Sequence, residues 1–261
     1  MVPALWIAKT GLEAQQNRLG VISNNLANAN TTGFKRSRIQ FADLLYQNIR
    51  QVGASNTQDS KLPTGLTLGT GVRTVSTAKN HEQGNIVLTE NPLDVAIQGR
   101  GFLQVTRADG TQGYTRNGSL QVDDTGQVVT SSGEAITPAI TIPGDALSVT
   151  IGSDGTVSAV QPGSATPTQV GTIQLADFVN PRGLQPIGEN LYVETASSGA
   201  PTTGNPGISG LGTVLQGAVE SSNVNVVEEL VNMIETQRVY ELNSRSISTS
   251  DQMLQYVSNN L

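Results

Sequence analysis

Residues 23–36 read Ser-Asn-Asn-Leu-Ala-Asn-Ala-Asn-Thr-Thr-Gly-Phe-Lys-Arg, and they close an N-terminal segment whose apolar residues recur every seven positions. The recurring residues are Leu5, Leu12, Leu19 and Leu26, each followed three residues later by Ala8, Gln15, Ile22 and Ala29. A seven-residue repeat keeps one stripe of a helix turned toward a partner helix, so the pattern predicts a coiled-coil-like helix of about 25 residues. We expect this helix to stop near Gly33.

The C-terminal segment repeats this spacing. One column with a period of seven consists of Val226, Met233, Tyr240, Ile247, Leu254 and Leu261, and its companion column consists of Leu230, Gln237, Ser244, Asp251 and Ser258. A stripe that is apolar in only one column is narrow, so this helix cannot bury itself fully against one neighbour. We expect Asn223 or Ser222 to cap its start.

These two periodic segments predict an assembly seam between subunits. Its expected residues are Leu5, Leu12, Leu19, Ile22, Leu26, Val226, Leu230, Met233, Tyr240, Ile247 and Leu254. The alternative is a helical hairpin that packs inside a monomer.

The residues between the two helices divide into an arm and a β domain. From Gln47 to Gly71 the sequence has little period of either kind, which indicates an extended arm. The following region is punctuated by the turn signals Asp109-Gly110, Asn117-Gly118, Asp124-Thr125-Gly126, Ser132-Gly133 and Asp154-Gly155. Because Asn-Gly and Asp-Gly supply the positive φ of tight hairpins, we predict an antiparallel β domain, sandwich or barrel-like.

The expected fold class is therefore α+β, in four parts. Residues 1–33 form an N-terminal heptad helix, 34–77 an arm and connector, 78–217 a central β domain, and 218–261 a C-terminal heptad helix. The two helices would form one coiled-coil-like module.

Composition argues against most catalytic and binding functions. A net charge of −6 without a Lys/Arg run argues against nucleic acid and anionic membrane partners. The chain has no cysteine, and its single histidine, His81, is expected to be a surface residue without a catalytic role. Asp123-Asp124 is expected to form a turn. We therefore predict no catalytic, cofactor-binding or metal-binding residue.

The sequence also carries no visible membrane or secretory signal. No apolar run approaches the roughly 20 residues of a membrane-spanning helix, and the N-terminus lacks the pattern of a secretory signal peptide. Another route is expected if the chain leaves the cytoplasm.

Residues 23–36 closely resemble the signature of flagellar basal-body rod and hook proteins. The matching positions are Asn24, Asn25, Leu26, Ala27, Asn28, Thr31, Gly33, Phe34 and Lys35. Residues 220–241 resemble the C-terminal signature of the same family, and residues 94–102 and 114–118 resemble its central β module. The resemblance covers essentially the whole chain.

This resemblance implies a structural subunit and not an enzyme. Length, together with Leu62-Pro63-Thr64-Gly65-Leu66 and Gly69-Thr70-Gly71 in the arm, favours a subunit of the distal rod, the drive shaft that carries torque to the hook. A proximal rod paralogue is the alternative, and a β-rich extracellular adhesin or a carboxylate-dependent glycan hydrolase are more distant rivals.

The partners implied by the resemblance are further copies of the chain in a homopolymer, proximal rod proteins, the hook protein, the P and L ring proteins as a bushing, and the flagellar export apparatus. The implied location is the basal body between periplasm and outer membrane, reached by export without a cleaved signal. No cofactor is implied.

Overall fold

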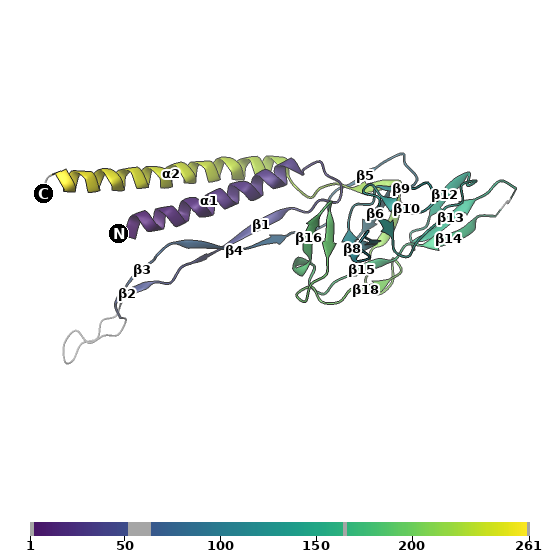
Figure 1. Ribbon diagram of the computed structural model, residues 1–261, viewed down its shortest axis with the longest axis horizontal. Coiled ribbons are helices and arrows are strands. Elements are labelled where there is room, and N and C mark those ends of the chain that lie inside the picture. Colours follow the sequence, from purple (N-terminus) through teal and green to yellow (C-terminus); the bar gives the residue numbers. More distant parts are fainter. Residues whose placement is uncertain (1–2, 52–63, 164–165, 260–261) are drawn as a thin grey trace. The chain divides into compact units, whose positions relative to one another are not determined.

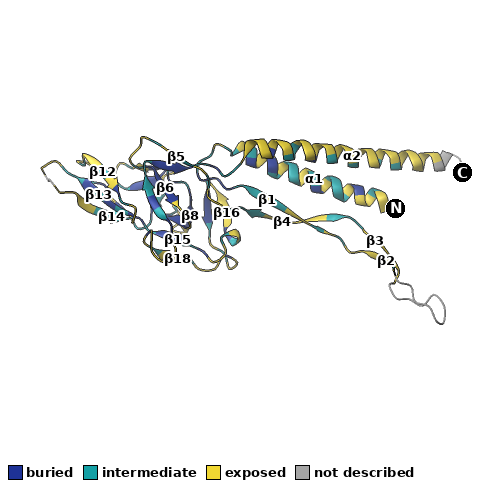
Figure 2. Cartoon of the chain, turned by 180° about the vertical axis from the view of Figure 1, so that it is seen from behind, coloured by how far each residue is buried: buried dark blue, intermediate teal, exposed yellow. Residues whose placement is uncertain are grey.

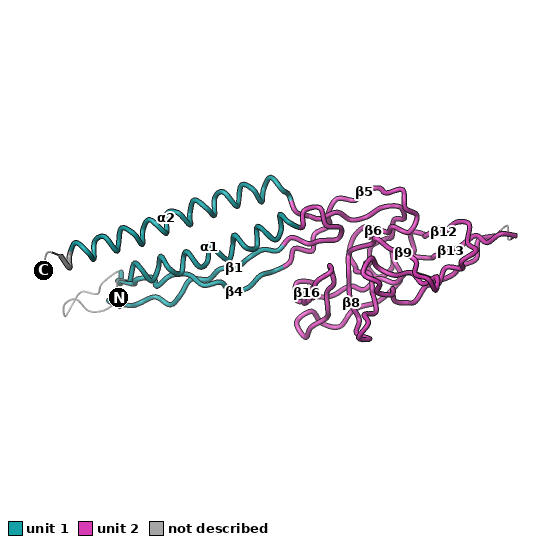
Figure 3. Tube along the Cα trace, turned by 45° about the horizontal axis from the view of Figure 1, so that its top comes forward, with its two compact units in different colours: residues 1–27, 37–78, 225–261 teal, residues 28–36, 79–224 magenta. Residues whose placement is uncertain are grey.

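The computed structural model describes residues 3–51, 64–163 and 166–259, the last three of these by their backbone only. Leu62, Pro63 and Leu261 of the predicted features lie outside the described residues. The chain divides into two compact units (Figure 3). Unit 1 contains residues 1–27, 37–78 and 225–261, and unit 2 contains residues 28–36 and 79–224. Among the described helices, none is long and apolar enough to cross a membrane.

Unit 1 contains two long helices and a β-ribbon (Figure 1). The helices are α1 (Pro3–Ala27) and α2 (Val226–Asn259), and the ribbon strands are β1 (Ser37–Asp43), β2 (Gln47–Arg50), β3 (Leu66–Leu68) and β4 (Val72–Lys79). Strand β1 pairs with β4, and β2 pairs with β3 in antiparallel register. The described parts of the predicted arm thus form a two-stranded ribbon. The ribbon is held by hydrogen bonds between backbones, so it needs no regular period of apolar side chains.

The N-terminal helix has the predicted length but ends before Gly33. Helix α1 contains 25 residues and stops at Ala27, where the Thr31 N–H donates to the Asn28 carbonyl at 3.2 Å and turns the chain. Gly33 follows in the left-handed region, with φ of 70°. A glycine in this conformation often follows a helix end, and here the turn begins earlier.

The predicted cap of the C-terminal helix is wrong. The Asn225 side-chain oxygen accepts the N–H groups of Val227 at 3.1 Å and Glu228 at 3.3 Å, so Asn225 caps α2. Asn223 cannot serve there because its amide is occupied by contacts inside unit 2. Ser222 instead accepts the Val224 N–H at 3.3 Å.

Unit 2 is the central antiparallel β domain that the sequence predicts. Among the described residues its largest sheet has nine strands, in the order β16-β17-β8-β7-β11-β10-β9, with β15 pairing with β7 and β18. Further pairs join β6 to β19 and β5 to β20, and β12, β13 and β14 form a separate sheet. The strand bounds are β5 Ile86–Leu88, β6 Val95–Gln98, β7 Phe102–Thr106, β8 Gln112–Thr115, β9 Leu120–Val122, β10 Val128–Thr130, β11 Ala135–Ile136, β12 Ser148–Ile151, β13 Thr156–Val160, β14 Thr168–Thr172, β15 Leu175–Asp177, β16 Gln185–Gly188, β17 Leu191–Val193, β18 Thr202–Gly204, β19 Thr213–Gln216 and β20 Ala218–Glu220, and a short 3₁₀ helix spans Pro181–Gly183.

Strand β7 separates two apolar clusters because alternate side chains point to opposite faces of a sheet. Leu103 and Val105 belong to the main core, which also contains Leu120, Ile136 and Leu175. Phe102 belongs to a smaller aromatic cluster that also contains Tyr114, Ala176, Phe178, Leu184 and Tyr192. Both faces of β7 are therefore buried.

Most of the predicted turns are confirmed. Gly110, Gly126, Gly133 and Gly155 all have positive φ between paired strands. The predicted hairpin at Asn117-Gly118 is wrong, because β8 pairs with β7 and β17 while β9 pairs with β10. A Cβ at Gly118 would lie 1.6 Å from the Val95 carbonyl oxygen, so a close backbone contact explains this glycine.

Candidate assembly faces and a buried charge cluster

The contact between α1 and α2 in unit 1 is mostly small and polar. On α2 the buried side chains are Glu229 and Thr236, and on α1 they are Ala8, Ala14, Ile22 and Asn25. A Cβ at Gly11 would lie 3.1 Å from the Asn243 side-chain nitrogen, so the absent side chain at Gly11 permits this close approach. Glu229, Thr236 and Asn243 are spaced by seven, so α2 turns a polar column toward α1.

The predicted seam residues are only partly covered by this contact. Ile22 is buried, and Leu5, Leu12, Leu19, Leu26, Met233 and Ile247 are half-buried. Val226, Leu230, Tyr240 and Leu254 are exposed to between 40% and 43%. Figure 2 shows the exposed residues along α2. The exposed seam residues therefore remain available to a further partner.

Asn25 fixes the end of α1 inside unit 1. Its side-chain oxygen accepts the Ser37 N–H at 2.8 Å, and its side-chain nitrogen donates to the Ser37 carbonyl at 2.9 Å. The same nitrogen lies 3.3 Å from the Glu229 carboxylate. This buried side chain ties α1 to the start of the ribbon and to α2, so the signature residue acts within the monomer.

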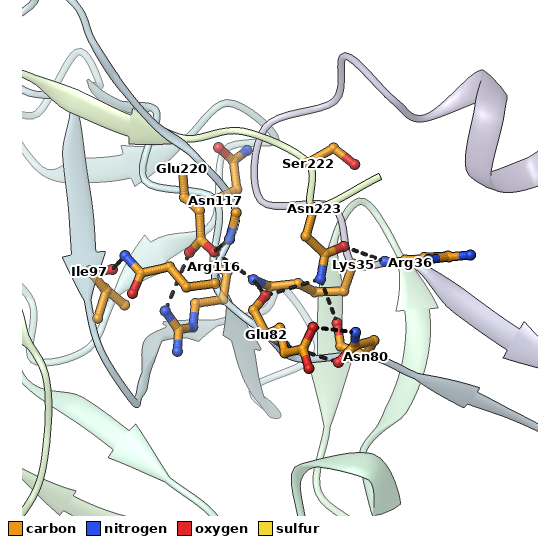
Figure 4. Close-up of polar contacts among 12 residues, drawn as sticks. Lys35, Arg36, Asn80, Glu82, Ile97, Arg116, Asn117, Glu220, Ser222 and Asn223 are labelled. Atoms are coloured by element: carbon orange, nitrogen blue, oxygen red, sulfur yellow. Dashed lines mark hydrogen bonds and ion pairs between the residues drawn. The ribbon is translucent and has the colours of Figure 1, made fainter. Parts of the chain in front are cut away.

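Unit 2 contains a buried cluster of three charged side chains centred on Glu220 (Figure 4). Lys35 Nζ lies 2.5 Å from Glu220 Oε1, and both side chains are fully buried. Arg116 Nη1 lies 3.3 Å from Glu220 Oε2 and is also buried. The Gly84 N–H donates to Glu220 Oε1 at 2.7 Å. One carboxylate thus neutralises one of two buried cations.

Further hydrogen bonds fasten the neighbouring segments to this cluster. Lys35 Nζ donates to the Glu82 carbonyl at 2.7 Å, and Arg116 Nη2 donates to the Gly99 carbonyl at 2.7 Å. Asn223 accepts the Arg36 N–H at 2.8 Å and donates to the carbonyls of Asn80 and Glu82 (Figure 4). Segments 28–36, 79–85 and 218–224, through which the chain enters and leaves unit 2, are thereby joined.

Burial and neighbouring charges shift the pKa values of the side chains in and beside this cluster. Burial lowers the pKa of Lys35, although the Glu220 charge opposes that shift. Burial also lowers the pKa of Arg116. Tyr192 is buried beside Glu220, and its pKa is raised to about 12.

The prediction that His81 is a surface residue is wrong. Its ring packs edge-on against Phe102 and Tyr192, at centroid distances of 5.5 and 5.3 Å. Burial, followed by the charges of Lys35, Arg116 and Lys79, lowers the pKa of His81 to about 4. The prediction failed because the residues on either side of His81 are polar and indicate an exposed segment.

The remaining signature residues form the turn that delivers Lys35 to the cluster. The Gly33 N–H donates to the Glu220 carbonyl at 2.7 Å, and a Cβ at Gly33 would lie 2.6 Å from the Asn117 nitrogen. Phe34 is buried beneath Lys79, whose Nζ lies 4.3 Å from the ring centroid. Leu26, Asn28 and Thr31 are half-buried, and Asn24 and Ala27 are exposed. The signature mainly stabilises the monomer.

Sequence reasoning flagged Lys35 but missed its partners Arg116 and Glu220. A usable signal was present for Glu220, which follows Ala218-Val219 in a short apolar run. A charge at such a position requires a buried partner. Glu220 is fully engaged by donors and offers no free carboxylate, and among the described residues no group of His, Asp and Glu could hold a metal ion.

Three family models match the chain. They describe a flagella basal body rod protein at residues 5–35, a flagellar hook protein FlgE/F/G D1 domain at residues 96–159, and a flagellar basal body rod FlgEFG protein C-terminal region at residues 215–261.

Relatives that match nearly the full length of the chain are also named as flagellar basal-body rod proteins. The chain is 56% identical over 258 residues to the flagellar basal-body rod protein FlgG of Buchnera aphidicola subsp. Schizaphis graminum, with 99% of each chain covered. It is 48% identical over 256 residues to FlgG of Caulobacter vibrioides, covering 98% of each, and 38% identical over 271 residues to FlgG of Bacillus subtilis, covering 99% of each. With its whole length matched in this way, the chain belongs to the flagellar basal-body rod protein family.

Proposed function

We propose that this chain is a structural subunit of the distal rod of the bacterial flagellum, where it polymerises into the drive shaft that carries torque to the hook. Relatives at 38–56% identity over nearly the full chain bear the name of a flagellar basal-body rod protein. The chain is a structural rod protein and not an enzyme. Its partners would be further copies of itself, proximal rod proteins, the hook protein, ring proteins that act as a bushing, and the export apparatus.

The observation that carries polymerisation is the exposed apolar surface of α2. Its polar column faces α1, whereas Val226, Leu230, Tyr240 and Leu254 remain 40–43% exposed in the monomer. Large apolar side chains that stay exposed along one helix are candidates for an interaction site. The heptad columns of the two terminal helices would form a coiled-coil-like seam between subunits. The terminal helices and the arm would make the contacts of the polymer, and the β domain would lie outside them.

Substitution within the seam tests this function. Leu19→Asp places a charge at a half-buried position of α1, at a cost of several kcal/mol unless the side chain reaches solvent. We expect the β domain to keep its circular dichroism spectrum while rods fail to form by electron microscopy. Ser23→Asp, at an exposed position of the same helix, is the control and should assemble. Normal rods from Leu19→Asp would exclude the seam as an assembly surface.

A further inference from the structure

Asn117-Gly118 is the only Asn-Gly pair in the chain, and the fold does not use it as the hairpin turn that the sequence predicts. An asparagine before a glycine is a reactive pair, because the glycine has no side chain to keep its backbone nitrogen away from the asparagine side chain. That nitrogen can lose its proton, attack the side-chain carbon Cγ and release the side-chain nitrogen as ammonia. Water then opens the resulting succinimide ring to give either aspartate or isoaspartate.

In folded unit 2, hydrogen bonds hold the Asn117 side chain and backbone. Asn117 Oδ1 accepts the Thr32 hydroxyl at 3.0 Å and the Ser119 N–H at 3.2 Å. The Asn117 N–H donates to the Thr115 hydroxyl at 3.0 Å. Closing the succinimide ring requires the side chain and the following peptide plane to turn together, which these hydrogen bonds oppose.

The backbone around this pair is also fixed by close packing. The Gly118 carbonyl accepts the Val95 N–H at 2.9 Å, and the Val95 carbonyl lies so close to Gly118 that a Cβ would not fit. Gly33 packs against the preceding residue, where a Cβ at Gly33 would lie 2.8 Å from the Asn117 Cα. The Gly118 nitrogen is therefore not free to approach Asn117 Cγ, because that approach needs rotation of the packed backbone.

We propose that Asn117 is a site of spontaneous deamidation, reactive in the unfolded chain and protected once unit 2 has folded. The two products differ in their effect on folding. Aspartate is tolerated, because its carboxylate accepts the same hydrogen bonds from Thr32 and Ser119. Isoaspartate lengthens the main chain by one methylene group before Gly118, where the packing leaves no room for it. The inference concerns the chain before assembly, so it does not depend on polymerisation.

Isoaspartate at this position would also disturb the buried charge cluster, beside which Asn117 lies (Figure 4). Arg116, the preceding residue, is held by its ion pair with Glu220. Gly118, the following residue, is held by its backbone contact with Val95. A longer main chain between these two anchors cannot satisfy both, so a chain with isoaspartate at this position should fail to close unit 2.

Mass spectrometry of folded and unfolded chains tests the protection. Samples in native buffer and in guanidinium chloride are kept at the same mildly alkaline pH. Fragmentation that separates aspartate from isoaspartate then follows deamidation at residue 117 over time. We expect the reaction to be about tenfold or more slower in the folded chain, because a protected group reacts only through opening. Equal rates in the two states would overturn the proposal.

Ser132→Asn supplies a matched control within unit 2. It places a second Asn-Gly pair in the exposed turn between β10 and β11, where a Cβ at Gly133 would meet nothing within 4 Å. We expect this pair to deamidate in the folded chain while Asn117 in the same molecules stays intact. If both pairs react at the same rate in the folded chain, the contacts around Asn117 do not protect it and the proposal fails.

Refolding of aged chains tests the effect of isoaspartate. Chains incubated in guanidinium chloride are diluted into buffer, and the folded fraction is separated by size-exclusion chromatography. We expect isoaspartate at residue 117 to be depleted several-fold from this fraction relative to aspartate. The variant Asn117→Asp should refold with the circular dichroism spectrum of the wild type. Failure of this variant to fold, or undiminished isoaspartate in the folded fraction, would overturn the proposal.

Discussion

At the scale of the residue, Glu220 is the side chain on which the charge cluster depends. Its carboxylate receives Lys35, Arg116 and the Gly84 N–H, and its backbone carbonyl receives the Gly33 N–H. A buried ion pair adds little stability relative to apolar residues, but removing one partner leaves an uncompensated charge. The cluster is therefore most sensitive to the loss of Glu220, its one anion.

We expect Glu220→Gln to destabilise the monomer by about 3–5 kcal/mol, because Lys35 and Arg116 would remain buried without a counter-charge. Urea unfolding followed by far-ultraviolet circular dichroism measures this change. Arg100→Gln is the control: Arg100 is 67% exposed in its ion pair with Asp177, so its loss should cost less than about 1 kcal/mol. Equal effects of the two substitutions would contradict the assigned role of Glu220.

His81 should make the stability of the monomer pH-dependent. Its pKa is about 4 in the folded chain and 6.5 in the unfolded chain, so the unfolded state binds more protons between these values. Stability therefore falls as pH decreases from 6.5 toward 4, by roughly 3 kcal/mol for this group. His81→Phe keeps an aromatic ring against Phe102 and Tyr192 and should remove this component.

Comparing the wild type with His81→Phe isolates the contribution of His81 to the pH dependence, because the same carboxylates titrate in both proteins. The measurement is the unfolding free energy of each at pH 7 and pH 4. If the difference between wild type and His81→Phe is the same at both values, the histidine is not buried as a neutral ring.

At the scale of the element, two glycines of α1 differ in whether they lie against α2. Gly11 lies against Asn243, whereas a Cβ at Gly20 would meet nothing within 4 Å. We expect Gly20→Ala to stabilise α1 by about 0.5–1 kcal/mol, the usual gain within a helix. Gly11→Leu should destabilise it, because the side chain must displace Asn243.

Fluorescence of Trp6, the only tryptophan in the chain, reports unfolding of α1 in both variants. A stabilising Gly11→Leu would show that the helices are not in close contact at this position.

Local chemistry determined which elements could be predicted. Turns with a glycine at positive φ are specified by the backbone conformation of one residue, so the turns at Gly110, Gly126 and Gly155 could be predicted from the sequence alone. Gly118 was not, because its reason is the approach of Val95 from elsewhere in the chain. Likewise the sequence marked Asn223 as a good cap, yet its amide serves Arg36 and Asn80, which only tertiary structure brings near.

At the scale of the whole molecule, the two units should differ in stability. Unit 2 has an apolar core in which Leu103, Val105 and Leu175 are fully buried. The helices of unit 1 bury few side chains against each other, and helices stabilised by a narrow contact are marginal alone.

Hydrogen exchange should therefore be fast around Leu12 and Ile247 in dilute monomer and slow around Leu103. Assembly into rods should protect the helices, while leaving the β domain unchanged. Strong protection of both helices in the dilute monomer would show that they do not depend on assembly for order.

The joining of segments 28–36 and 218–224 at Glu220 also has a consequence for the order of folding. Lys35 and Glu220 are separated by 185 positions, and Lys35 remains without its carboxylate until residues near the C-terminus arrive. Contacts of such long range must overcome loop-closure entropy and slow folding. Hairpins such as β7–β8 can form early, because their contacts are local. A chain that still lacks residues 218–224 can therefore form such hairpins, and strand β20 would capture the N-terminal turn at residues 28–36 only after those residues are present.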